Sequence, residues 1–230
     1  MRGELASRVE TALGQSGDAL RLAELLAIRL CHDLSGPLGT LMGSLELVAE
    51  DPSTAAEALP LAGDVSQTLG KRLRLLRAAW GGATASLSVD EFAAVAGGAQ
   101  LRRGKIDLDG LDRSARFSPT AARVALNAVL LAAESLPAGG IAAFSGHPAS
   151  AVVVTLAGPR AAWPAGFSAC IGNMALAREM LWNSDDGQAS RALQVPLIVL
   201  IAEAVGVRLS LLMAPTAEAV PPLLMNFAGG

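Results

Sequence analysis

The sequence of 230 residues predicts an α+β protein, with an N-terminal helical hairpin followed by a C-terminal α/β sandwich. Apolar residues recur at intervals of three and four through the first 80 residues, and Asp51-Pro52 interrupts this pattern. After Gly81-Gly82 the pattern changes to short apolar runs that alternate with helical ones. We therefore expect a helical domain at residues 1–82 and an α/β domain at residues 83–230.

The first long helix is expected from about Asp18 to Glu50. Its apolar residues alternate by four and three, which is typical of the contact line, or seam, of a helical bundle. The first seam consists of Ala27, Cys31, Leu34, Leu38, Leu41, Leu45 and Val48. A cysteine at a seam position is expected to be a buried apolar residue rather than a reactive thiol.

The second long helix is expected to begin at Ser53 or Thr54, with Glu57 placed for a capping box, and to end at Gly81-Gly82. The short connection makes the two helices antiparallel neighbours. A hairpin alone cannot cover both apolar faces, so we expect two copies to close a four-helix bundle as a homodimer. The second seam consists of Ala58, Ala62, Val65, Leu69, Leu73, Leu76 and Trp80.

The α/β domain is expected to contain three helices and five strands. Ser118-Pro119 opens one helix by the rule that a capping residue is followed by proline, and His147-Pro148 marks a turn between two strands. Residues 161–188 show no pattern that can be assigned. The expected helices are 89–100, 119–133 and 190–205, and the expected strands are 105–111, 141–146, 151–156, 208–213 and 223–227.

Composition narrows the function classes. The net charge of −3, the 3% of aromatic residues and the lack of a long basic block argue against nucleic acid as a partner. Mean hydropathy is high, at +0.44, but prolines and glycines interrupt the longest uncharged run, residues 135–159, so no membrane span is expected. Glu4 and Glu10 stand where a signal peptide needs apolar residues, so we expect a cytoplasmic protein. The two cysteines form neither a disulfide framework nor a metal-ligand spacing.

The segment with the clearest chemical potential is His-Asp-Leu-Ser-Gly-Pro-Leu at residues 32–38. His32 lies one position from the seam, and its helical neighbours Ser35, Gly36 and Gly39 are too short to cover the imidazole. Each interior glycine costs about 1 kcal/mol of helix stability relative to alanine, which suggests that a partner must approach closely. A purely structural histidine among tightly packed helices is the alternative interpretation.

This segment resembles the H-box of two-component histidine kinases, in which the histidine is phosphorylated on the first helix of a dimeric bundle. The wider sequence resembles the ChpT-type histidine phosphotransferases of alphaproteobacteria. Three segments carry the second resemblance: residues 30–34 with Pro37, residues 71–74 leading to Ala79-Trp80-Gly81, and residues 127–131 leading through Leu136-Pro137 to Gly139-Gly140.

The resemblance implies a dimeric phosphorelay protein without a cofactor of its own. His32 would take a phosphoryl group from the receiver domain of a hybrid kinase and pass it to the receiver of a response regulator. A neutral imidazole near pH 7 suits that role, because its reference pKa is about 6.5. Asp33 matches the acidic residue that orients or deprotonates the histidine, and Mg²⁺ is expected on the receiver.

Hairpin geometry adds candidate residues for docking the receiver. His32 lies about 19 residues before the turn, and the same distance beyond the turn ends near Lys71. Lys71 and Arg74, which lie off the second seam, are therefore expected near the docked receiver. Arg29 is expected there because it lies one turn before His32 on the same side, and Ser35, Gly36 and Gly39 are included with it. A solvated basic face is the alternative for the cations, since helix ends commonly carry Lys and Arg.

The resemblance also shows where a kinase would hold ATP. Kinases of this type carry two asparagines about four residues apart, whereas here Asn127 is followed by Leu131. The adenine-binding Asp-x-Gly-x-Gly is replaced by Ala-Gly-Pro-Arg-Ala at residues 157–161. We therefore expect a degenerate ATPase-like domain without nucleotide, and polar roles inside the core for Asn127 and Glu134. A divergent ATP-dependent kinase and a non-catalytic scaffold for receivers stay open as alternatives.

Overall fold

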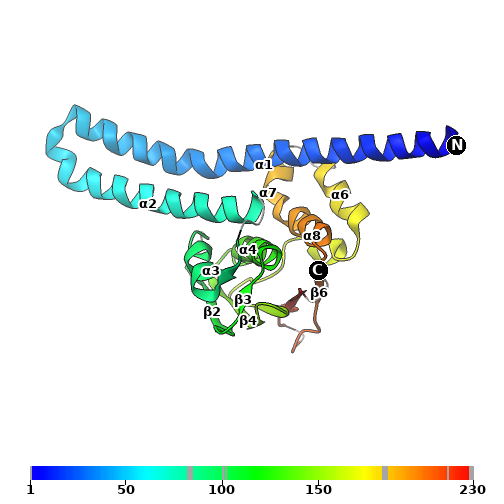
Figure 1. Cartoon of the computed structure of the whole chain (residues 1–230). Helices are drawn as coiled ribbons and strands as arrows, with labels where there is room; N and C mark the ends of the chain where they lie inside the picture. Colours follow the sequence, from blue (N-terminus) through cyan, green and yellow to red (C-terminus); the bar gives the residue numbers. More distant parts are fainter. Residues whose placement is uncertain are drawn as a thin grey trace.

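The computed structural model describes residues 2–81, 85–99, 101, 103–182, 186–216 and 218–227. It confirms the α+β class and the N-terminal helical hairpin. Helix α1 (Arg2–Glu50) and helix α2 (Ala55–Trp80) run antiparallel and are joined through the short 3-10 helix η1 (Pro52–Thr54). Figure 1 shows the hairpin lying along one side of the C-terminal domain, with the first part of α1 extending past the end of α2.

The ends of the hairpin helices differ from the prediction in two ways. Helix α1 begins at Arg2, sixteen residues before the expected start at Asp18. Thr54 is the N-cap of α2, as expected, but the capping box does not form, because the Thr54 hydroxyl donates to the backbone oxygen of Asp51 at 2.7 Å and makes no capping hydrogen bond. Asp51 caps η1 by accepting a 2.9 Å hydrogen bond from the backbone N–H of Ser53. The predicted domain boundary near residue 82 falls outside the described residues.

The face of α1 that packs against α2 is rotated from the predicted seam. Asp33 and Ser44 lie toward the interior, with an exposed side-chain fraction of 12% for Asp33 and an exposed residue fraction of 7% for Ser44. Cys31, expected to be buried, is exposed in the single chain, and Leu38 and Leu45 are 41% and 50% exposed. Part of the heptad pattern is therefore uncovered within one chain.

The C-terminal domain contains a mixed five-stranded sheet of order β2-β4-β5-β7-β6. Strands β2 (Gly104–Leu111) and β4 (Gly140–His147) are parallel, which requires a crossover connection, and α4 (Pro119–Glu134) provides it. The other pairings are antiparallel. The remaining strands are β5 (Ala151–Ala157), β6 (Arg208–Leu211) and β7 (Leu223–Asn226), and a separate two-stranded pair, β1 (Leu87–Ser88) with β3 (Arg116–Phe117), was not predicted.

One face of this sheet is covered by helices, which makes the predicted sandwich. Alternate residues of β5 are buried (Val152, Val154 and Leu156), as expected for a sheet packed on one side. Helices α3 (Val89–Ala96), α4 and α8 (Gln194–Ala204) are labelled between the sheet and the hairpin in Figure 1. The unassigned region contains α5 (Phe167–Cys170), α6 (Met174–Trp182) and the first part of α7 (Asp186–Ala192), so the predicted helix 190–205 is split into α7 and α8.

Helix α4 forms as expected and connects the core to the hairpin. The Ser118 hydroxyl accepts a 3.2 Å hydrogen bond from the backbone N–H of Ala121, and Pro119 occupies the first turn. Asn127 is fully buried, and its amide nitrogen donates to the backbone oxygen of Ala79 at 2.8 Å while its oxygen accepts from Gln194 at 3.0 Å. Asn127 thus has the predicted polar role in the core, where it links α4 to α2 and α8.

A search of the described helices finds none with the length and apolar character that crossing a bilayer requires.

Candidate functional site

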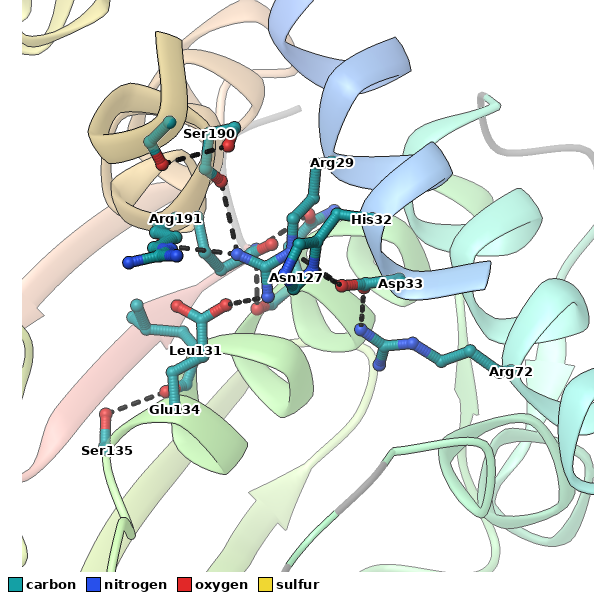
Figure 2. Close-up of polar contacts among 12 residues, drawn as sticks. Arg29, His32, Asp33, Arg72, Asn127, Leu131, Glu134, Ser135, Ser190 and Arg191 are labelled. Carbon is teal, nitrogen blue, oxygen red and sulfur yellow. Dashed lines mark hydrogen bonds and ion pairs between the residues drawn. The ribbon is translucent and has the colours of Figure 1, made fainter. Parts of the chain in front are cut away.

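His32 presents an accessible imidazole on the hairpin. Its side chain is 67% exposed, and its Nδ1 lies 3.5 Å from Oδ1 of the neighbouring Asp33. Figure 2 shows the imidazole beside a cluster of charged side chains that come from both domains. An imidazole whose Nδ1–H faces a carboxylate has its Nε2 lone pair free for nucleophilic attack.

Asp33 lies between two arginines. Its Oδ2 accepts a 2.7 Å hydrogen bond from Nη2 of Arg72 on α2, and its Oδ1 accepts a 3.1 Å hydrogen bond from Nε of Arg29. Burial alone would raise the pKa of Asp33, but the Arg72 hydrogen bond and the charges of Arg29 and Arg72 outweigh it and hold the pKa below its usual value. Asp33 is therefore an anion at neutral pH, placed beside Nδ1 of His32.

Arg29 connects this cluster to the C-terminal domain. Its Nη2 donates to Oε1 of Glu134, the last residue of α4, at 2.9 Å. Its Nη1 lies 3.2 Å from each of the backbone oxygens of Ser190 and Arg191, so the guanidinium also caps the last turn of α7. Burial raises the pKa of Glu134, and the charge of Arg29 offsets only part of that effect.

A row of glycines continues the face of α1 on which His32 lies. Gly36, Gly39 and Gly43 follow His32 at intervals of four, three and four, which places all four residues on one side of a helix with 3.6 residues per turn. A Cβ atom built on any of these glycines would meet nothing within 4 Å. Ser35 is also exposed, although its hydroxyl donates back to the Cys31 carbonyl at 2.7 Å. The face beside the imidazole is thus open to a partner's backbone.

Of the three cations predicted to dock a receiver, two are exposed and the third, Arg29, is largely buried. Lys71 and Arg74 are exposed on α2, and Nζ of Lys71 lies 3.4 Å from Oε1 of Gln67. Within the described part of the chain, no hydrogen bond or ion pair joins either of them to His32. The sequence predicts Arg29 as a docking residue too, but its side chain is only 17% exposed and is held by the contacts described above. These contacts tie the two domains together, and docking of a receiver at Arg29 stays a prediction.

Arg72 is the site residue that sequence reasoning missed. Its side chain is 9% exposed, and it forms an ion pair with Asp33. Counting residues from the turn predicts the neighbouring Lys71 at this place instead. A signal was available, because Arg72 follows Leu69 by three residues and precedes Leu76 by four, so it lies on the apolar face of α2. A charged residue on a buried face requires a partner of opposite charge, and Asp33 lies at the matching distance before the turn.

A small cavity adjoins the charged cluster. It has a volume of about 140 Å³, and two of its lining residues, Arg72 and Trp80, have buried ring or guanidinium N–H groups without a partner among the described residues. Such a polar cavity suits ordered water rather than an apolar ligand. No three His, Cys, Asp or Glu side chains in the described ranges gather in a way that would hold a metal ion.

Comparison with known proteins identifies the family. A sequence model of the histidine phosphotransferase C-terminal domain matches residues 89–217, which is more than half of the chain. The chain belongs to the histidine phosphotransferase family. The 1.7 Å structure of a bacterial phosphotransferase has the same fold, with a TM-score of 0.66 and 23% identity over 90% of this chain and 95% of that one. No curated protein matches the sequence.

A histidine phosphotransferase needs a reactive histidine, and this one has two histidines. His147 ends β4, is 49% exposed and lies 3.9 Å from Asp112, but it is in a strand turn where its Nδ1 accepts a hydrogen bond from the backbone of Ala149. His32 differs in lying on the hairpin, beside the open glycine face and a carboxylate held by two arginines.

Proposed function

We propose that this histidine phosphotransferase relays a phosphoryl group between receiver-domain aspartates of a hybrid histidine kinase and a response regulator, through phosphohistidine at His32. The observation that carries the proposal is the exposed imidazole with Nδ1 beside Asp33, next to glycines that leave room for a partner. The exposed Ser35, Gly36 and Gly39 on α1 form the centre of the docking surface. Lys71 and Arg74 are its basic edge on α2.

The chemistry needs only groups that this chain and its partner supply. The Nε2 lone pair of His32 attacks the phosphorus of an aspartyl phosphate, the P–O bond breaks, and the receiver aspartate leaves as a carboxylate. The Nδ1 proton stays on the ring, where the anionic Asp33 stabilises the positive charge that develops. The reverse step returns the group to a second aspartate. Mg²⁺ acts on the receiver, and this chain uses no ATP.

We propose further that the protein works as a cytoplasmic homodimer. Cys31, Leu38, Met42 and Leu45 follow one another at intervals of seven, four and three, so they form one exposed apolar row on α1. Because helix residues advance by about 100°, this row lies on a different side of α1 from His32 and the glycines. A second hairpin covering the row would complete a four-helix bundle and leave both imidazoles accessible.

Replacing Leu38 and Leu45 together by aspartate should convert the dimer to a monomer. Each aspartate would have to be buried as a charge in the interface, at a cost that a bundle of this size does not tolerate. Sedimentation equilibrium at several concentrations measures the result. Leu47→Asp is the matched control, because Leu47 is as exposed as Leu45 (49% against 50%) but points about 200° away from it on the helix. A monomeric wild type would contradict the dimer.

The decisive test of function is phosphoryl transfer to this chain from a phosphorylated receiver domain, without ATP. We expect acid-labile label on this chain, as a phosphohistidine requires, and its loss when a second, unphosphorylated receiver is added. Absence of label with several receivers would overturn the relay. In that case, measurable ATP binding would indicate a divergent kinase, and receiver binding without ATP binding would indicate a scaffold.

A further inference from the structure

We propose that Glu134, at the end of α4 in the C-terminal domain, is a positioning residue for His32 that acts through Arg29 and Asp33. The inference rests on the proposed function, because it concerns the same phosphoacceptor. It gives the ATPase-like domain, for which no nucleotide is expected, a role in the transfer itself: the domain holds the reactive histidine in its productive orientation.

A continuous series of polar contacts connects the two domains at this point (Figure 2). Oε1 of Glu134 accepts from Nη2 of Arg29 at 2.9 Å, Nε of Arg29 donates to Oδ1 of Asp33 at 3.1 Å, and that same oxygen lies 3.5 Å from Nδ1 of His32. The series spans 105 positions of sequence between Arg29 and Glu134. Every member is on a helix, so helical hydrogen bonds hold the backbone of each residue in place.

The shared oxygen is the reason why Glu134 matters to the imidazole. Oδ1 of Asp33 faces both Arg29 and His32. A stronger hydrogen bond from the guanidinium to this oxygen therefore weakens the interaction of the same oxygen with the Nδ1 proton of His32. Arg29 is paired with two carboxylates, Asp33 and Glu134, so Glu134 weakens the attraction between Arg29 and Asp33. Removing its negative charge leaves Asp33 as the only carboxylate paired with Arg29, and Oδ1 then turns toward the guanidinium.

The C-terminal domain also sets the place of the guanidinium. The carbonyl oxygens of Ser190 and Arg191 hold Nη1, while Glu134 holds Nη2, so this domain contacts two of the three nitrogens of Arg29. On the other side of Asp33, Arg72 of α2 fixes Oδ2 at 2.7 Å. The carboxylate is thereby held at both ends, with two arginines balanced by two carboxylates, and only Oδ1 remains next to His32.

The test compares Glu134→Gln with the wild type, each as the whole 230-residue chain, by initial rates of label acceptance over a range of phosphorylated-receiver concentrations. We expect the maximal rate to fall about tenfold, by analogy with the loss seen when a group that orients a metal-binding histidine is removed. The half-saturating receiver concentration should not change, because the described contacts of Glu134 are with Arg29 and not with the exposed residues proposed for docking on α1 and α2. ¹⁵N spectra of the imidazole should show one dominant tautomer, with the proton on Nδ1, in the wild type and a mixture in the variant.

Two further variants make the result decisive. Glu134→Asp restores the charge and should recover part of the rate and of the tautomer preference. Glu203→Gln, a matched change at an exposed position of α8, should alter neither. A wild-type rate and spectrum for Glu134→Gln would overturn the inference while leaving the relay intact. A lower melting temperature with an unchanged tautomer would show a purely structural tie and would also overturn it. A wild type that accepts no label would instead refute the proposed function.

Discussion

Replacing His32 by alanine should reduce phosphoryl acceptance from a receiver to the background of the assay. The transfer requires a nitrogen nucleophile that can reach the aspartyl phosphate of a docked receiver, and His32 is the histidine on the hairpin. The variant should fold normally, because the imidazole is 67% exposed and Asp33, its neighbour, keeps its hydrogen bonds to Arg29 and Arg72. Substitutions at exposed positions usually change stability by less than about 0.5 kcal/mol. Label incorporation without ATP is the measurement, and receiver binding should persist.

His147→Ala is the matched control, and it should retain full acceptance. His147 resembles His32 in being exposed and in having an acidic neighbour, Asp112, at 3.9 Å. It also lies inside the segment matched by the family model, whereas His32 precedes that segment. Loss of label in His147→Ala with retention in His32→Ala would therefore move the phosphoacceptor to the C-terminal domain and refute the assignment.

The hairpin and its register could be predicted because both depend on local signals. Heptad spacing predicts long helices, and the single break at Asp51-Pro52 fixes where the chain reverses. Once the turn is placed, residues at equal distances from it face each other, which is why counting from His32 reached the neighbour of Arg72. The rotation of α1 about its own axis was harder to predict. Helix α1 has apolar residues on two of its sides, so their spacing alone does not indicate which side packs against α2.

The polar cluster could be predicted only in part, because most of its contacts join distant segments. His32 and Asp33 are adjacent in sequence and were identified together. The partners of Arg29 in the C-terminal domain come from the ends of α4 and α7, and no periodicity or spacing indicates which end of which helix meets α1. The secondary structure of residues 161–188 could not be assigned for a related reason. The three helices in this region are short, so they span too few turns to show a helical period.

Arg72→Met should destabilise the protein by about 3 kcal/mol, because removing one partner of a buried ion pair leaves the other charge uncompensated. The side chains of Arg72 and Asp33 are 9% and 12% exposed, and their 2.7 Å hydrogen bond connects the two helices of the hairpin. Arg29 stays next to Asp33, which keeps the loss at the lower end of the range for buried pairs. Urea unfolding at fixed protein concentration and pH 7 measures the change. Lys71→Met, on the exposed neighbour, should have little effect.

A double variant and a pH series distinguish loss of the Asp33–Arg72 ion pair from simple loss of the packing of the Arg72 side chain. Asp33→Asn with Arg72→Met removes both charges, so its destabilisation should be smaller than the sum of the two single effects. The pKa of Asp33 is lowered on folding, so its contribution to stability is present above the unfolded-state pKa, near 3.9, and is lost as the pH falls through the folded-state value. The difference between wild type and Arg72→Met should therefore shrink on acidification. Additive effects with no pH dependence would mean that Arg72 contributes only its apolar stem, and that Asp33 is held beside His32 by Arg29 alone.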